Sequence, residues 1–387
     1  MAIAEQNEII NVTKSCKACD HCNSVCPTGA IVGRMGEQHS INYRKCINCG
    51  QCLINCPFNA IEDRNTEIAV QSELQNNNKF VVVQVAPAVR VALGEEFGLE
   101  PGSNVKNKMF AALRKLGFDR VYDTEFSADL TIMEEGTELI HRVYAALGVE
   151  GYDHVGPLPQ FTSCCPAWIK YAEDIYPSIL PHLSTAKSPQ QMFGSIAKTY
   201  GAQKLNIDPD KMVVVSVMPC TAKKYECDRP EMIASGYQDV DYVITTRELA
   251  NMIKDARIDF LSLPDEDADK FMGSSTGAAT IFGVTGGVME AALRTAYEVL
   301  SGETLGQIEF TQVRGLAPVR EATVDIPVKA LNTTLPVNVC IVTGTKHVKS
   351  VVDDFLAGRS NYHFIEIMNC PGGCINGGGQ PIRRDAY

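Results

Sequence analysis

The sequence lacks an excess of basic residues and a long apolar run, and we expect it to carry no export signal of its own. Its 35 lysines and arginines are outnumbered by 46 acidic residues, giving a formal net charge of −11, whereas nucleic-acid-binding proteins need a concentrated basic surface. No apolar run reaches the ~18 residues of a membrane-spanning helix. Residues 1–8 contain acids where a secretion signal has a basic region and then an apolar stretch. We therefore expect no nucleic-acid partner, no membrane span and a cytoplasmic protein, or a periplasmic one if a signal-bearing partner carries it there.

The cysteines do not have the distribution of a disulfide framework. All 15 occur in a chain of 387 residues, and their repeated C-x-x-C spacings indicate metal ligation instead. Thirteen of them fall in motifs. We expect the other two, Cys227 and Cys340, to be small buried hydrophobic residues. With 45% hydrophobic residues, a chain of this length can bury a large core divided among two or three domains.

A cysteine pattern is repeated near the amino terminus. Residues 16–27 and 46–57 both read C-x-x-C-x-x-C-x-x-x-C-P. This repeat is typical of two-cluster bacterial ferredoxins, in which the fourth cysteine of each run binds the other cluster; a zinc site would leave the third cysteine of each run surplus. We interpret Asp20 and His21 as solvated spacers. The predicted 4Fe-4S ligands are Cys16, Cys19, Cys22 and Cys56 for one cluster and Cys46, Cys49, Cys52 and Cys26 for the other.

A polar stretch follows this region. Residues 71–79 have no apolar periodicity and are interpreted as a helix end or linker. Beyond it, short runs rich in β-branched residues are typical of buried strands in a parallel sheet, and stretches with apolar spacing near 3.6 predict helices. We expect strands at 80–85, 212–217 and 337–342, and helices at 108–116 and 246–253. The resulting prediction is a ferredoxin-like α+β domain over residues 1–75 and an α/β domain over residues 80–387.

A glycine-rich segment, CPGGCINGGGQ at residues 370–380, indicates a bound group. Glycines at this density let the backbone approach a ligand closely, at an entropic cost that a plain loop has no reason to carry. TSCCP at 162–166 and MPCTAKK at 218–224 also place cysteine beside proline at an element end. The three segments contain five cysteines, of which four make a set of the size that binds a 4Fe-4S cluster. These four are Cys165, Cys220, Cys370 and Cys374. Another glycine-rich stretch, residues 271–292, lacks the spacing of a phosphate-binding loop.

The motifs TSCCP, MPCxxK and CPGGC, present in this order, resemble those of the catalytic subunit of the iron-only (FeFe) hydrogenases, most closely the heterodimeric type of sulfate-reducing bacteria. The resemblance implies a catalytic domain of two α/β lobes, each on a four-stranded parallel or mixed sheet, closing over the cluster. It also implies reversible interconversion of H2 with protons and electrons at an H-cluster. The two ferredoxin-type clusters would relay electrons to an external carrier, a ferredoxin or a cytochrome.

The resemblance further implies a cofactor that the chain does not make. A two-iron subcluster with CO, cyanide and an amine-bearing dithiolate would be bridged to the cubane by Cys374 and inserted by maturation proteins. Lys223 would donate to a cyanide in a dry pocket, where an ammonium becomes strongly directional. Ala88 stands where some relatives have serine, so one donor near the distal cyanide is expected to be missing. Other residues expected against the cofactor are Met218, Met368, Phe282, Ala86 and Pro87.

A proton relay is implied as well. Cys164 precedes a ligand but is not needed to complete the four, so its thiol is available to carry protons. Glu135, Glu138 and Arg142 are spaced i, i+3 and i+7, on one face of a helix; without the resemblance, we would interpret them as a surface ion-pair face. The implied relay runs through Cys164, Glu135, Ser184, Glu138 and then Arg142 near the surface.

The sequence allows two alternative interpretations. A hydrogenase-like iron–sulfur sensing or assembly protein would have little turnover, but such relatives tend to lose the relay and pocket residues that are retained here. A ferredoxin fused to an unrelated domain would not explain the three later motifs. Because only residues 382–387 follow GGGQP, where many single-chain relatives continue with helices, we also expect a small helical subunit to cover the lobes.

Overall fold

The computed structural model describes residues 8–270, 275–303, 313–315 and 317–382. The chain divides into two compact units. Unit 1 comprises Met1–Phe126, Gln190–Ser274 and Cys374–Tyr387, and unit 2 comprises Ser127–Pro189 and Ser275–Gly373. The boundary between them falls inside the CPGGC motif. Our interpretations of residues 1–7, 271–274 and 383–387 lie outside the described residues.

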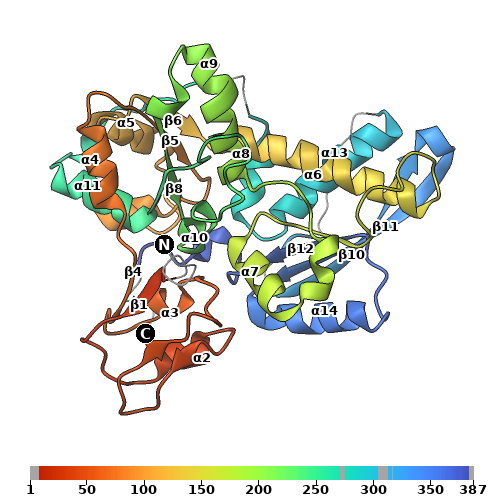
Figure 1. Ribbon diagram of the computed structural model, residues 1–387, viewed down its shortest axis with the longest axis horizontal. Helices are drawn as coiled ribbons and strands as arrows, with labels where there is room; N and C mark the ends of the chain where they lie inside the picture. Colours follow the sequence, from red (N-terminus) through yellow and green to blue (C-terminus); the bar gives the residue numbers. More distant parts are fainter. Residues whose placement is uncertain (1–7, 271–274, 304–312, 316, 383–387) are drawn as a thin grey trace. The chain divides into compact units, whose positions relative to one another are not determined.

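The amino-terminal part of unit 1 is built from short elements (Figure 1, red). Two antiparallel strand pairs, β1 (Ile10–Val12) with β4 (Ile61–Asp63) and β2 (Ile31–Val32) with β3 (Ser40–Ile41), flank the cysteine runs. The short helices α2 (His21–Val25) and α3 (Gln51–Ile54) each begin within a cysteine run. A small core that includes Ile10, Leu53 and Ile61 holds this part together. Helix α4 (Glu67–Leu74) then ends inside the predicted polar stretch, which leads into the next strand.

The rest of unit 1 is organised on a parallel four-stranded sheet of order β6-β5-β8-β9. Its strands are β5 (Phe80–Val85), β6 (Arg120–Asp123), β8 (Met212–Met218) and β9 (Tyr242–Thr245). The strands are almost wholly buried, because helices add their apolar faces to the same core. These helices are α5 (Lys106–Leu116), α8 (Pro189–Ile196), α9 (Ala202–Leu205), α10 (Ala222–Cys227) and α11 (Thr246–Asp255).

Unit 2 contains a mixed four-stranded sheet of order β10-β11-β12-β7. Its strands are β7 (Gln160–Phe161), β10 (Val319–Val328), β11 (Thr333–Thr343) and β12 (Phe364–Met368). The predicted strand at 337–342 lies in β11, which is parallel to β12 but antiparallel to β10. The sheet is therefore mixed, which agrees with the predicted parallel or mixed sheets, because β10 and β11 form a hairpin.

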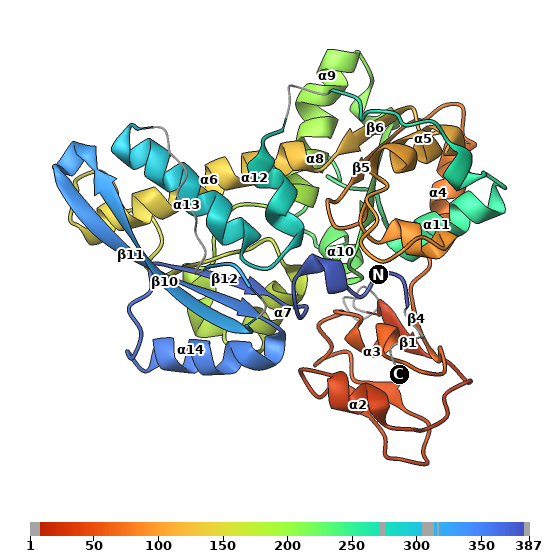
Figure 2. The same ribbon diagram turned by 180° about the vertical axis from the view of Figure 1, so that it is seen from behind.

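Helices cover both faces of this second sheet. Figures 1 and 2 show α6 (Glu125–Ala146) and α13 (Gly287–Ser301) on one face, and α7 (Pro166–Ile175) and α14 (Val348–Leu356) on the other. The first pair shares a core with the sheet, in which Leu139, Leu293 and Val339 are buried. The short α12 (Gly277–Thr280) precedes α13. The predicted fold class, an α/β architecture with parallel and mixed sheets after a ferredoxin-like α+β part, is confirmed. Across the described ranges, no helix combines the length and apolarity needed to span a bilayer.

Candidate metal centres

Two hollows in the ferredoxin-like part are each lined by four cysteines. In each, three cysteines come from one run and the fourth from the other run, as the crossed pattern predicts. Within the described residues, no group of three or more Cys, His, Asp or Glu is arranged to hold a single metal ion. The first hollow is lined by Cys16, Cys19, Cys22 and Cys56, and the second by Cys26, Cys46, Cys49 and Cys52.

The two cysteine runs share an unusual backbone. Ala18 and Asp20 in the first run have positive φ angles of 55° and 65°. Asn48 and Gly50, at the equivalent places in the second run, have φ angles of 56° and 70°. A non-glycine residue in this region costs of order 1–3 kcal/mol and persists where the surroundings require it. The repeated conformation turns successive cysteines inward, which is how C-x-x-C-x-x-C surrounds a bound group.

Backbone amides point at several of these sulfurs. The Ala30 N–H lies 3.2 Å from Cys26 Sγ, and the Ala60 N–H lies 3.3 Å from Cys56 Sγ. Such donors stabilise thiolates and tune the reduction potential of the cluster that they hold. The chemistry of both hollows therefore fits a 4Fe-4S cluster.

Asp20 is more than the solvated spacer that we expected. Its Oδ1 lies 2.8 Å from Nε2 of His39, a buried residue whose Nδ1 lies 3.9 Å from Cys16 Sγ. The hydrogen bond to Asp20 raises the pKa of His39. No motif indicated this contact, because His39 lies between the two cysteine runs and outside both.

In unit 1, one signature cysteine follows a strand of the parallel sheet, and the segment after a second one is bound to the same edge. Cys220 comes two residues after β8, and the glycine segment after Cys374 is bound to the same turn. The Gly379 N–H donates to the Pro219 carbonyl at 2.8 Å. A Cβ atom at Gly377 would lie 2.2 Å from that carbonyl oxygen, which is why the position requires glycine. Parallel α/β sheets bind ligands at this edge.

Other predicted pocket residues of unit 1 lie at this edge. Met218, the last residue of β8, is 3% exposed. Ala86 and Pro87 follow the adjacent strand β5, and the Ala86 N–H donates to the Val217 carbonyl. Lys223, with a side chain 13% exposed, lies 2.9 Å from Oε2 of Glu226. Its ammonium is therefore held in a mostly dry surrounding.

In unit 2, the other two signature cysteines also follow neighbouring parallel strands. Cys165 comes after β7 and is the N-cap of α7, whereas Cys370 comes after β12. The loops are tied together, since the Thr162 N–H donates to the Ile365 carbonyl at 3.0 Å. Met368, the last residue of β12, is 3% exposed, and Phe282 is 7% exposed. Each unit thus presents two signature cysteines at the carboxyl edge of a sheet.

Four predicted relay residues are joined by hydrogen bonds within unit 2. The Ser184 hydroxyl donates to Glu138 Oε2 at 2.8 Å, and the Ser163 N–H donates to Glu135 Oε1 at 3.3 Å. Burial raises the pKa of Glu135 to about 8, although hydrogen bonds from Ser163 and Ser184 offset part of this effect. Glu138 is also 2.6 Å from the Arg142 guanidinium. Cys164 is partly buried, two residues before α7.

Arg142 does not lie near the surface, so that part of our prediction was wrong. Its side chain is 1% exposed. The guanidinium donates to loop carbonyls, including Pro157 at 2.9 Å and Leu183 at 2.8 Å. Carbonyls buried in a loop need donors, and arginine supplies five N–H groups in a planar fork. The spacing of the helix correctly placed Arg142 beside Glu138 but gave no information about the loop that covers it.

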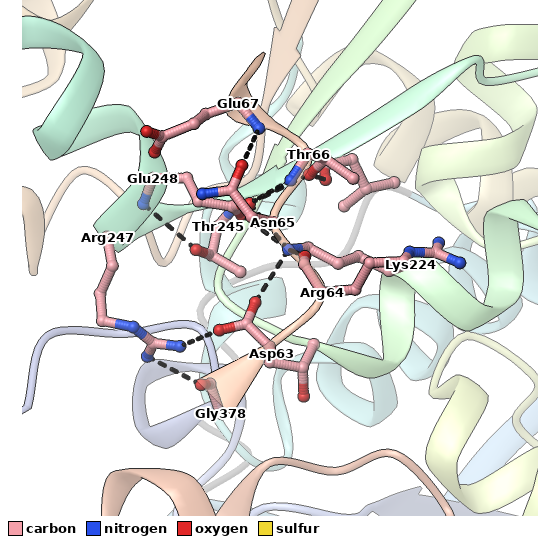
Figure 3. Close-up of polar contacts among 12 residues, drawn as sticks. Asp63, Arg64, Asn65, Thr66, Glu67, Lys224, Thr245, Arg247, Glu248 and Gly378 are labelled. Atoms are coloured by element: carbon pink, nitrogen blue, oxygen red, sulfur yellow. Dashed lines mark hydrogen bonds and ion pairs between the residues drawn. The ribbon is translucent and has the colours of Figure 1, made fainter. Parts of the chain in front are cut away.

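A buried charge network in unit 1 was also missed. Figure 3 shows Lys224 surrounded by Asp63, Arg64 and Glu248, with Arg247 on the far side of Asp63. The only sign of this network in the sequence was Lys224, the second lysine of MPCTAKK. We assigned a role to its neighbour Lys223 but none to Lys224. Its partners lie far away in the sequence, in β4 and α11.

Comparison with known proteins gives two matching family models. Residues 79–378 match the C-terminal domain of the iron-only hydrogenase large subunit, and residues 8–74 match a 4Fe-4S dicluster domain. The chain is 53% identical over 369 residues to the periplasmic [Fe] hydrogenase large subunit of Nitratidesulfovibrio vulgaris, covering 95% of this chain and 85% of the relative.

A solved FeFe hydrogenase structure concerned with stepwise H-cluster assembly has a TM-score of 0.73 and 40% identity, covering 83% of this chain and 86% of that one. A lower identity, 31% over 356 residues, relates the chain to cytosolic iron-sulfur assembly component 3 of Bos taurus, covering 89% of this chain and 72% of the relative.

Proposed function

Because the chain belongs to the iron-only hydrogenase large-subunit family, it is an oxidoreductase of the FeFe hydrogenase class, and we propose below which residues carry its chemistry. It interconverts H2 with protons and electrons at an H-cluster, and its ferredoxin-like part relays electrons through 4Fe-4S clusters. The observation that carries the residue assignment is the pair of hollows, each lined by four cysteines in the crossed pattern.

The first proposal concerns the clusters and the domains. Residues 1–75 form a ferredoxin-like domain with two 4Fe-4S clusters, held by the cysteines that line the two hollows. Residues 80–387 form the hydrogenase catalytic domain. The residues that would hold its cubane are Cys165, Cys220, Cys370 and Cys374. Cys165, Cys220 and Cys370 each follow a parallel strand, and the glycine segment after Cys374 is bound to the turn after β8. Both features support this assignment, because such edges bind ligands in α/β proteins.

The second proposal concerns the remainder of the H-cluster. A two-iron subcluster carrying CO, cyanide and an amine-bearing dithiolate would be held through Cys374 and would be inserted by maturation proteins. When bound, this group supplies the site at which H2 is cleaved or formed. The chain would contribute apolar side chains that exclude water, from Met218, Met368 and Phe282. It would also contribute backbone groups at Ala86 and Pro87, and the ammonium of Lys223 as a hydrogen-bond donor. The burial of both methionines supports a site from which water is excluded.

The third proposal is the proton path. Cys164 exchanges a proton with the reacting centre, and Glu135, Ser184 and Glu138 pass it on toward Arg142. A buried carboxyl group with a pKa of about 8 holds a proton at neutral pH and can release it to a neighbouring acceptor. The hydrogen bond from Ser184 to Glu138 provides one step of this path. Since Arg142 is buried, we assign it the role of holding Glu138 in place, with the proton leaving the path elsewhere.

The alternative is an iron–sulfur sensing or assembly protein with little turnover. The relative named for cytosolic iron–sulfur assembly supports this reading at 31% identity, whereas the relative named as a hydrogenase supports the enzyme at 53%. The hydrogen-bonded set of Glu135, Ser184 and Glu138 also favours the enzyme, because an assembly protein has no need to move protons.

The partners and the compartment are further proposals. One relative is a periplasmic hydrogenase large subunit. We propose that this chain also associates with a small helical subunit, which would carry the export signal for the periplasm, and that it exchanges electrons with a ferredoxin or a cytochrome. Its substrates are H2 and protons.

Infrared spectroscopy of the matured protein tests the function. Bands from metal-bound CO and cyanide, together with hydrogen/deuterium exchange between H2 and deuterated water, are the expected result. Protein that was exposed to the maturation system and shows neither would contradict the hydrogenase assignment and favour the assembly alternative. Iron content alone does not separate the two, since both would hold 4Fe-4S clusters.

A further inference from the structure

A buried charge network in unit 1 connects the ferredoxin-like part to the part built on the parallel sheet (Figure 3). At its centre is Lys224 in α10, whose side chain is 0% exposed. The ammonium lies 2.8 Å from Asp63 Oδ2 in β4 and 2.8 Å from Glu248 Oε2 in α11, and it donates to the carbonyl of Arg64. An ammonium has three N–H donors. The N–H donors of Lys224 therefore bind acceptors in both the ferredoxin-like part and the part built on the parallel sheet.

Arg247 completes the network. It lies 2.9 Å from Asp63 Oδ1 and donates to the carbonyls of Gly378 and Gln380 at 2.8 Å and 2.6 Å. Glu248 in turn accepts hydrogen bonds at 2.8 Å from the Thr66 N–H and at 2.7 Å from the Thr245 N–H. The positive charges of Lys224 and Arg247 equal in number the negative charges of two carboxylates, Asp63 and Glu248. A balanced, directional network fixes the position of the groups that it joins.

The segments that this network joins carry predicted cluster ligands. Gly378 lies four residues after Cys374, and Lys224 lies four residues after Cys220. On the other side, the loop around Cys49 is in direct contact with both segments. The Thr221 hydroxyl donates to the Asn48 carbonyl at 2.7 Å. A Cβ atom at Gly50 would lie 2.8 Å from the Gly378 Cα, so the two backbones touch.

We infer that Lys224 is a positioning residue for electron transfer, holding the Cys49 loop in register against the segments of Cys220 and Cys374. The inference rests on the proposed cluster ligands. Electron tunnelling slows steeply as the gap between redox centres widens, so a small shift of this loop reduces the rate without altering either centre. A buried ion pair contributes little net stability compared with apolar packing, whereas its geometry can specify register. The role assigned to Lys224 is therefore alignment.

The test uses the full chain as Lys224→Met, with Lys198→Met as the matched control. Lys198 is another buried lysine of unit 1, with a side chain 6% exposed and 2.8 Å from Asp241, but it has no partner in the ferredoxin-like part among its described contacts. Two rates are compared in the matured protein. Hydrogen/deuterium exchange needs only the active site, whereas H2 oxidation linked to a protein carrier also needs the ferredoxin-type clusters.

We expect Lys224→Met to lower the ratio of carrier-linked oxidation to hydrogen/deuterium exchange by about tenfold or more, and Lys198→Met to leave it within about twofold of wild type. A second readout requires no turnover. In protein loaded with 4Fe-4S clusters alone, amide hydrogen exchange should accelerate at residues 46–52 and 61–67 in Lys224→Met, with β5 and β8 unchanged.

Several results would overturn the inference. A wild-type rate ratio in Lys224→Met would show that the network does not set the electron path. An equal loss of both rates, with faster exchange throughout unit 1, would show a purely structural role. If Lys224→Met does not fold, Asp63→Asn takes its place, since it leaves Lys224 paired with Glu248; an unchanged ratio in that variant also rejects the inference. A wild-type protein without hydrogen/deuterium exchange would instead contradict the proposed function, and the amide exchange data would still decide the role of Lys224.

Discussion

The hydroxyl of Ser184 donates a 2.8 Å hydrogen bond to the carboxylate of Glu138, which is also 2.6 Å from the Arg142 guanidinium. Glu138 is thus held from two sides, by a neutral donor and by a cation. The neighbouring carboxyl Glu135, one helical turn earlier, has a pKa of about 8 because of burial. The helix therefore carries one carboxyl that retains a proton at neutral pH beside another that is fixed by arginine, an arrangement suited to passing protons in both directions.

Cys164→Ala tests the inner end of this path. The variant should retain its iron and its infrared bands but lose turnover by more than about a hundredfold, because general acid–base steps contribute 10²–10⁴-fold. Cys374→Ala is the matched control and should lose the two-iron bands altogether. Wild-type turnover of Cys164→Ala at every pH would show that the thiol carries no protons.

Glu135→Gln tests the buried carboxyl through stability. The pKa of Glu135 is raised from 4.5 to about 8 in the folded state. Between these values the unfolded chain releases a proton that the folded chain keeps, so the free energy of unfolding of the wild type falls as pH rises, by up to about 1.4 kcal/mol per pH unit. Glutamine does not ionise. The variant should therefore gain stability relative to the wild type from pH 5 to 8, measured by thermal unfolding of the cluster-loaded protein.

The control for this experiment is Glu134→Gln. Glu134 is exposed on the same helix, so the substitution should give no pH-dependent difference. A constant offset between Glu135→Gln and the wild type across this pH range would mean that Glu135 is ionised in the folded protein.

Local signals allowed much of the fold to be predicted from the sequence. The strand expected at residues 80–85 matches β5. A β-branched run between a polar stretch and a proline can form few secondary structures other than a strand. The crossed cysteine sets were predictable because fixed spacing determines which thiols converge. The partners of His39 and Lys224 were not predictable, since they depend on contacts between residues 19 to 161 positions apart. The burial of Arg142 was missed for the same reason, because helix periodicity contains no information about the covering loop.

Cys19→Ala and Cys49→Ala test whether the ferredoxin-type clusters serve transport. Each should reduce carrier-linked H2 oxidation by more than about tenfold while hydrogen/deuterium exchange at the active site stays within about twofold of wild type. Cys340→Ala is the control, since this cysteine is buried in β11 and outside both hollows. Equal loss in both assays would indicate that the clusters are structural.

Isolation from the native host tests the proposed small subunit. The periplasmic relative is named as a large subunit, and this name supports the proposal that the present chain also has a second, smaller subunit. We expect a small helical protein to co-purify, with an interface larger than the ~1,600 Å² typical of standard complexes. Mass measurement of the intact particle checks this. A stable and active particle containing this chain alone would contradict the proposal.

Gly378→Ala tests the close approach between the segment after Cys374 and the Cys49 loop. A Cβ atom there would lie 2.4 Å from the Cys49 carbonyl oxygen and 2.6 Å from the Gly50 Cα. Both neighbours are backbone atoms, so one segment has to move, and overpacking of this kind costs about 1–3 kcal/mol. Because the displaced loop carries a predicted ligand, thermal unfolding should shift to lower temperature and carrier-linked oxidation should fall more than hydrogen/deuterium exchange. Gly277→Ala is the control, since its Cβ would meet no atom within 4 Å, and it should change stability by less than about 0.5 kcal/mol. If Gly378→Ala behaves like this control in both measurements, the two backbones do not touch in solution, and the route for electrons between Cys49 and the catalytic cysteines has to be sought elsewhere.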